Sequence, residues 1–224
     1  MGSRRVTRAA AVLLFLAAGP AAAQSYTYHE PSPRNLEITP FAGLFWSTQV
    51  TTPNGSVVFD AAPDFGATLD IQVDHKSQIE ILYALARPQA RFQSSSPFYA
   101  SSPSFPVTTQ YLQLGGLTTF QQGSMEPFLA GGLGMAWFHP SDVQVPGAAS
   151  IQPADTLLFA FNLGLGVKWY LSDVIGLRIE ARAFMPVYLS SGTFLSGPNG
   201  AALQVNAGVP LVQGDLSLGL VIAP

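Results

Sequence analysis

Apolar and polar residues alternate along much of the chain. Between Val174 and Phe184 every second residue, from Ile175 to Ala183, is apolar, and the residues between them include Arg178, Glu180 and Arg182. Successive side chains of a β-strand point to opposite faces. This stretch therefore predicts a strand with one apolar face and one charged face.

The same period of two recurs in seven other segments and predicts an all-β chain. The eight predicted strands are residues 36–46, 65–74, 78–86, 109–120, 127–137, 159–170 and 174–184, and one whose limits within 203–223 the pattern leaves open.

The predicted connections alternate between short and long. The short ones are residues 74–77, 121–125 and 171–174, and the long ones are residues 49–64, 88–106, 139–155 and 190–201, rich in Ser, Pro, Gly and Asn. Short turns at one end and long loops at the other are typical of transmembrane β-barrels.

The first residues have the three parts of a secretory signal peptide. Arg4, Arg5 and Arg8 are followed by an apolar run and by the small residues Ala21 to Ala23. This order predicts a cleaved leader over residues 1–23. We expect residues 24–35 to form an N-terminal periplasmic segment and residues 36–224 to form the barrel domain.

Composition agrees with an exported membrane barrel. Charged residues make up 10 % of the chain, against about 25 % in typical globular domains, and the mean hydropathy is +0.28. Without the leader the chain carries seven basic and 13 acidic residues, which argues against nucleic acid as a partner. The chain has no cysteine, so disulfides and thiol chemistry are excluded.

All three tryptophans fall near the ends of predicted strands, on the apolar faces. They are Trp46, Trp137 and Trp169. Aromatic side chains at these places form the interfacial girdles of membrane barrels, so we expect the three rings to lie at the lipid–water boundaries.

The segments PFLAGGLGMAW and LGLGVKWYLSDVIGLRIEARAF resemble the OmpA/OmpX-like outer-membrane β-barrel superfamily, often called the porin family. The resemblance covers nearly all of the chain after the leader. It implies an eight-stranded antiparallel transmembrane barrel in the outer membrane, with short periplasmic turns and long extracellular loops. It also implies outer-membrane lipid and the barrel assembly machinery as partners, a possible surface ligand of the loops, and no single activity. Such barrels usually end in an aromatic residue, whereas this chain ends in Pro224.

The charged face is expected to line the lumen. Facing lipid, Arg178 and Arg182 would each cost about 2–4 kcal/mol at the bilayer midplane. In an eight-stranded barrel the seventh strand faces the third and the sixth faces the second. The expected lumen network is Glu37, Asp70, Glu80, Lys168, Arg178, Glu180 and Arg182, four carboxylates against three bases. It is either an ionic plug of a closed barrel, the favoured interpretation, or the gate of a narrow pore.

Candidate chemistry is sparse. His139 and Ser141 resemble the His-x-Ser of barrel lipid-A deacylases, with Asp142 or Asp155 as an acid. Because the rest of that motif is missing, a solvated loop turn is the favoured interpretation. The spacing of residues predicts no metal site and no cofactor.

Three hypotheses for function follow. The first is an integral outer-membrane barrel with a structural or cell-surface role through its loops, without enzymatic activity. The second is a small channel or carrier for small or apolar molecules. The third is a soluble periplasmic lipocalin-like barrel, in which the apolar faces would point inward around a ligand.

Overall fold

The computed structural model describes residues 34–52, 55–94, 104–120, 123–142, 155–187, 192–196, 202–205 and 211–224. The predicted signal peptide and residues 24–33 of the predicted periplasmic segment lie outside these ranges. No helix within the described residues is long and apolar enough to cross a membrane.

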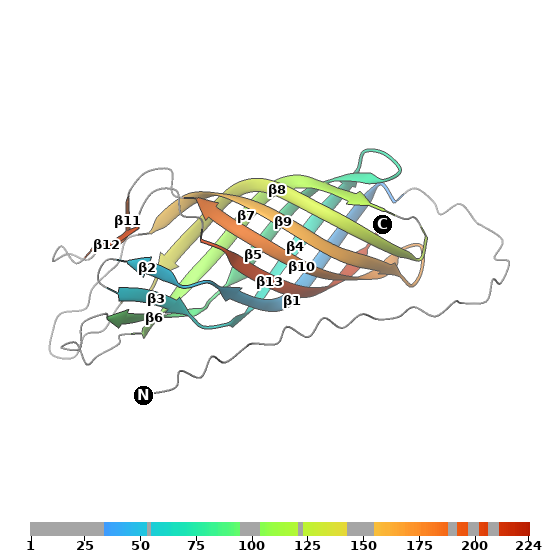
Figure 1. Ribbon diagram of the computed structural model, residues 1–224. Coiled ribbons are helices and arrows are strands. Elements are labelled where there is room, and N and C mark those ends of the chain that lie inside the picture. The colour runs from blue at the N-terminus through green and yellow to red at the C-terminus, as the bar shows by residue number, and fades with distance from the viewer. Residues whose placement is uncertain are drawn as a thin grey trace, which may run out of the picture. The chain divides into compact units, whose positions relative to one another are not determined.

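Eight antiparallel strands form a closed barrel (Figure 1). Their order around the wall is β7-β5-β4-β1-β13-β10-β9-β8, and the pairing of β7 with β8 closes the sheet. The strands are β1 (Leu36–Ser47), β4 (Ala62–Gln72), β5 (Ser77–Ala86), β7 (Ser104–Thr119), β8 (Met125–Pro140), β9 (Thr156–Tyr170), β10 (Ile175–Val187) and β13 (Gln213–Ile222). The predicted fold class and the number of wall strands are confirmed.

The two ends of the barrel differ as the sequence predicts. Residues 73–76, 120–124 and 171–174 connect strands at what we call the short-turn end, where the C-terminus also lies (Figure 1). In the first turn the Asp74 carboxylate accepts hydrogen bonds from the backbone N–H groups of Lys76 (2.7 Å) and Ser77 (2.9 Å). The Lys76 bond is the main cause that holds the pKa of Asp74 below its usual value of 3.8.

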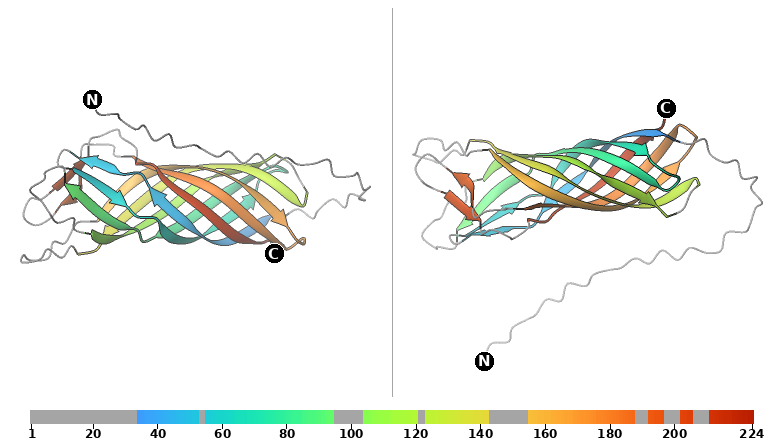
Figure 2. Two further views of the ribbon diagram at one scale, coloured as in Figure 1. Left: turned by 60° about the horizontal axis from the view of Figure 1, so that its bottom comes forward. Right: turned by 90° about the horizontal axis from the view of Figure 1, so that it is seen from above.

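The other end, which we call the long-loop end, contains five short strands, of which the first four in sequence lie where loops were predicted and the fifth overlaps the range 203–223 left open for the eighth predicted strand. They are β2 (Val50–Thr52), β3 (Gly55–Phe59), β6 (Gln89–Ser94), β11 (Gly192–Ser196) and β12 (Ala202–Val205). Strand β3 pairs with β2 and β6, and β6 pairs with the first residues of β7, so these strands extend the barrel wall (Figure 2). The last wall strand begins at Gln213, which sets the limit that the sequence pattern left open.

The side chains that point into the barrel are polar or charged nearer the short turns and apolar at the long-loop end. Over most of the wall's length apolar side chains face outward, as at Leu165 and Leu218, which are 62 % and 56 % exposed. At the long-loop end the buried inward positions are apolar instead, as at Val57, Phe59 and Phe105. The outward apolar belt requires lipid as its solvent. It also contradicts the lipocalin-like hypothesis, in which the apolar faces would point inward.

Glycines bring β7 and β8 close together. Gly115 pairs with Gly132 and Gly116 with Gly131. A Cβ atom on Gly115 would lie 2.2 Å from the carbonyl oxygen of Gly131. These mid-strand glycines therefore serve the close approach of two backbones, as expected for glycine inside a strand.

Candidate functional site: the lumen

The seven charged residues expected in the lumen all point into it. Glu37 comes from β1, Asp70 from β4, Glu80 from β5, Lys168 from β9, and Arg178, Glu180 and Arg182 from alternate positions of β10. All seven are buried. Ion pairs and hydrogen bonds join them into one connected network.

Arg178 lies at the centre of the network and is 2 % exposed. Its Nη2 donates to Glu80 Oε2 across the lumen (2.6 Å), and its Nη1 donates to Asp70 Oδ2 (2.9 Å). Its Nε donates to Glu180 Oε2 (2.9 Å). The guanidinium carbon also lies 4.6 Å from the ring centroid of Phe128. A buried guanidinium with this many partners is well compensated for its lost hydration.

Arg182 forms the side of the network nearer the long-loop end. Its Nη2 lies 2.7 Å from Glu80 Oε1, and its Nε donates to Glu180 Oε1 (2.9 Å). Its Nη1 donates to Asn162 Oδ1 (2.7 Å), and Asn162 in turn donates to Gln113 Oε1 (3.1 Å). The two arginines therefore share both glutamates, and the neutral amides of Asn162 and Gln113 extend the network.

Lys168 forms the side nearer the short turns and is fully buried. Its Nζ donates to Glu37 Oε2 (2.5 Å), Gln78 Oε1 (2.7 Å) and Asp70 Oδ2 (3.0 Å), three acceptors for its three N–H groups. The Tyr170 hydroxyl donates to the other oxygen of Glu37 (2.6 Å).

Glycine provides the space that one of these carboxylates occupies. A Cβ atom on Gly164 would lie 2.4 Å from Glu180 Oε1. The alternation of glycine and apolar residues in β9 therefore has a packing reason that the sequence pattern alone does not reveal.

The sequence analysis missed a second group of acids in the lumen. Asp64 on β4 and Asp215 on β13 are both buried in the lumen. They meet over Gly43 of the strand between them, where a Cβ atom would lie 2.7 Å from Oδ1 of each. Asp64 ends a predicted loop and Asp215 lies in the range left open for the last strand, so the alternating pattern does not place the two carboxyl groups together.

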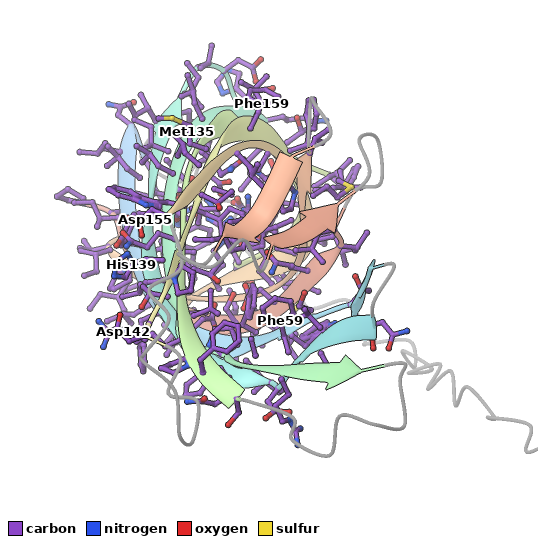
Figure 3. All side chains as sticks on the ribbon, turned by 90° about the vertical axis from the view of Figure 1, so that its left-hand side faces the viewer. Phe59, Met135, His139, Asp142, Asp155 and Phe159 are labelled. Atoms are coloured by element: carbon purple, nitrogen blue, oxygen red, sulfur yellow. The ribbon has the colours of Figure 1, made fainter. Side chains whose placement is uncertain are left out.

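An apolar cluster fills the lumen at the long-loop end. Tyr111 stacks on Phe184 with ring centroids 4.2 Å apart, and its hydroxyl contacts Gln213. The buried members of this cluster are Phe45, Val57, Phe59, Leu82, Ala84, Ala86, Ala90, Phe105, Val107, Tyr111, Ala136, Phe138, Ala160, Phe184 and Leu211. Figure 3, seen from the long-loop end, shows Phe59 on the inner side of the wall. The sequence analysis did not predict this second, apolar filling.

The three tryptophans lie on the outer face of the wall. Trp46 and Trp137 are near the long-loop ends of β1 and β8, and Trp169 is near the short-turn end of β9. They are 45 %, 49 % and 49 % exposed. Their positions are those expected for two interfacial girdles, and that role stays a prediction.

His139 pairs with an acid but not with the serine. Its Nδ1 contacts Asp155 Oδ1, and both side chains are about half exposed. Figure 3 shows His139 and Asp155 side by side near the rim, with Asp142 below them. The Ser141 N–H donates to the Pro106 carbonyl oxygen (2.9 Å), and within the described ranges no hydrogen bond joins the Ser141 hydroxyl to His139. The structure thus gives no positive sign of a catalytic serine.

No group of three or more metal-ligating side chains occurs among the described residues. In that part of the chain, the charged side chains of the lumen bind one another.

Comparison with known proteins identifies the fold. No protein-family model matches the sequence, and no curated protein matches it. Among solved structures, Neisserial surface protein A (NspA) is 12 % identical with a TM-score of 0.52, covering 85 % of this chain and 97 % of that one. The outer membrane protein OprG from Pseudomonas aeruginosa is 15 % identical with a TM-score of 0.51, covering 84 % and 94 %.

The chain therefore has the fold of an eight-stranded outer-membrane β-barrel. At these identities the likeness establishes the fold, and the lipid-facing belt gives the environment that this fold needs. The role of the barrel has to be argued from its lumen and its loops.

Proposed function

We propose that this protein is an integral outer-membrane barrel with a closed lumen, whose work is structural or at the cell surface. The observation that carries the proposal is the filling of the lumen by two successive layers. The ionic network occupies the part nearer the short turns, and the apolar cluster occupies the part nearer the long loops. An eight-stranded barrel leaves an interior only just wide enough for side chains, so two layers of packed side chains support a lumen that is closed to ions.

The loops carry the chemistry of a possible surface partner. Outside the lumen, the long-loop end carries two arginines, Arg87 and Arg91, against three aspartates, Asp60, Asp142 and Asp155. Arg91 is already paired with Asp60 on the outer surface. Because a polyanionic partner needs several unpaired cations, we infer that a surface ligand of these loops is neutral or cationic rather than polyanionic.

Planar-bilayer conductance of the folded protein tests the closed lumen. The ionic plug predicts no steady current in the wild type. It predicts none in Glu80→Gln either, because the apolar cluster seals the lumen independently. Asp60→Asn, on the outer surface, is the matched control. The unboiled protein must migrate as a folded barrel on a gel, so that a silent bilayer is not mistaken for an unfolded sample.

Two results would favour the alternative of a small channel. A steady wild-type current would reject the plug. A current that is absent in the wild type and present in Glu80→Gln would make the network a gate instead.

A further inference from the structure

Arg34 and Asn35, the two described residues before β1, lie at the short-turn mouth of the barrel. The Asn35 carbonyl oxygen accepts a hydrogen bond from the Gln72 N–H at the end of β4 (3.0 Å). The backbone is thereby held at the β1–β4 side of the mouth, and the side chain of Arg34 starts from there.

The Arg34 side chain reaches the opposite side of the mouth. Its Nη1 lies 3.7 Å from Glu126 Oε1, on β8, which is four strands from β1 in either direction around the wall. Its Nε donates to the carbonyl oxygen of Asp173 in the β9–β10 turn (3.3 Å). The side chain therefore reaches from the residues before β1 to β8 and the β9–β10 turn on the opposite side of the mouth.

The site that receives the guanidinium is itself held in place. The guanidinium carbon lies 3.6 Å from the ring centroid of Tyr170, a stacking geometry that suits a planar cation. The Tyr170 hydroxyl is bonded to Glu37 of the lumen network, and Glu126 accepts a hydrogen bond from the Gly123 N–H (3.4 Å). Ion pairs between exposed side chains are weak because water screens them. The Arg34 side chain is only 12 % exposed, so its pair with Glu126 is better shielded from water.

We propose that Arg34 is a latch: its side chain closes the short-turn mouth and seals the lumen from that side. The proposal rests on the closed lumen proposed above and adds a closure that the sequence analysis did not foresee. It also links Arg34, which precedes the first strand, to the ionic network, because Tyr170 contacts both Arg34 and Glu37.

Cysteine labelling tests the latch in the full-length folded barrel. The chain has no cysteine of its own. Ala223→Cys places a thiol beside the latch, because the Ala223 N–H bonds to Val174, the residue after Asp173. Ala136→Cys is the matched control: it is buried in the apolar cluster of β8. Each is made with Arg34 intact and with Arg34→Ala, and labelled with a small water-soluble thiol reagent.

The latch predicts that Arg34→Ala raises the labelling rate of Ala223→Cys by at least about tenfold, which corresponds to about 1.4 kcal/mol of closing free energy. Ala136→Cys stays protected in both backgrounds. Arg34→Lys gives an intermediate rate, because lysine keeps the charge and loses the planar stacking.

Each other outcome overturns a distinct statement. Unchanged labelling of Ala223→Cys, or fast labelling with Arg34 intact, rejects the latch. Labelling of both cysteines only in Arg34→Ala means that Arg34 holds the whole barrel together, which also rejects a local latch. Fast labelling of Ala136→Cys with Arg34 intact rejects the closed lumen itself, independently of Arg34.

Discussion

The pairing of Glu80 with Arg178 across the lumen is open to a double-mutant cycle. Glu80→Gln keeps the shape of the side chain and removes the charge that Arg178 and Arg182 share. Arg178→Met keeps much of the volume and removes the common partner of Asp70, Glu80 and Glu180. Both changes leave buried charges without their partners.

The structure sets the expected order of the effects. Removing one member of a buried ion pair costs about 3–5 kcal/mol. Arg178→Met is expected at or above the upper end, because it deprives three carboxylates of a cation, whereas in Glu80→Gln both arginines keep Glu180. In the double variant the two losses overlap, so its cost should fall below the sum of the single costs by about 1–3 kcal/mol.

Denaturant unfolding in lipid vesicles measures these free energies, with the fluorescence of the lipid-facing tryptophans as the signal. The matched control is the cycle of Asp60→Asn with Arg91→Met, an ion pair whose side chains are 42 % and 50 % exposed. Its coupling should be about 0–1 kcal/mol.

Additive costs in the lumen cycle would refute the direct pairing of Glu80 with Arg178. A coupling no larger than that of the exposed control would show that the lumen is as wet as the outer surface, and the buried network would then be the wrong description.

Three further predictions concern single sites. Gly164→Ala should destabilise the barrel by about 1–3 kcal/mol in the same unfolding assay, because the new methyl group would meet the Glu180 carboxylate. Asp64→Asn should be neutral or stabilising, since an amide can donate a hydrogen bond to Asp215 without charge repulsion; a loss as large as that of a lumen ion-pair variant would contradict this. Asp74 should titrate below 3.8 by NMR, so that its contribution to stability is present at neutral pH and lost as the pH falls through the lowered pKa; an ordinary pKa would disprove the turn hydrogen bonds.

Much of the wall could be predicted because a lipid-facing strand has a strict period of two. In β10 the apolar positions Ile175 to Ala183 alternate with Arg178, Glu180 and Arg182, and a shift by one residue would expose the charges to hydrocarbon. The same physical constraint acts on every wall strand, so the pattern recurs eight times along the chain.

The strands of the long-loop end could not be predicted in the same way. Strand β3 is short, and outside the lipid belt its outward face no longer has to be apolar. Only Val57 and Phe59 mark its buried side, and two residues do not define a period. The serine, proline and glycine residues around these strands therefore led to the prediction of loops.

In the lumen too, some charged residues could be predicted from the sequence and others could not. Charges inside regular strands could be assigned to the lumen by their register, as for Lys168 and Arg178. Arg34 precedes the first strand, and the meeting of Asp64 with Asp215 depends on the space above Gly43. Such contacts depend on how far a side chain extends and on the space around it. The alternation of polar and apolar residues gives only the face to which a side chain points.

The most direct test of the account compares two neighbouring residues of β13 as single cysteines in lipid vesicles. Leu218 is exposed on the apolar belt and Ser217 is buried in the lumen. A fluorophore attached to Leu218→Cys before the barrel is folded into vesicles should be quenched by brominated lipid; in the folded protein, thiols are probed with a charged, water-soluble reagent and with a small neutral one. Ser217→Cys should react with neither until the barrel is unfolded. Rapid reaction of Ser217→Cys with the water-soluble reagent in the folded protein would show a water-filled pore and contradict the closed barrel.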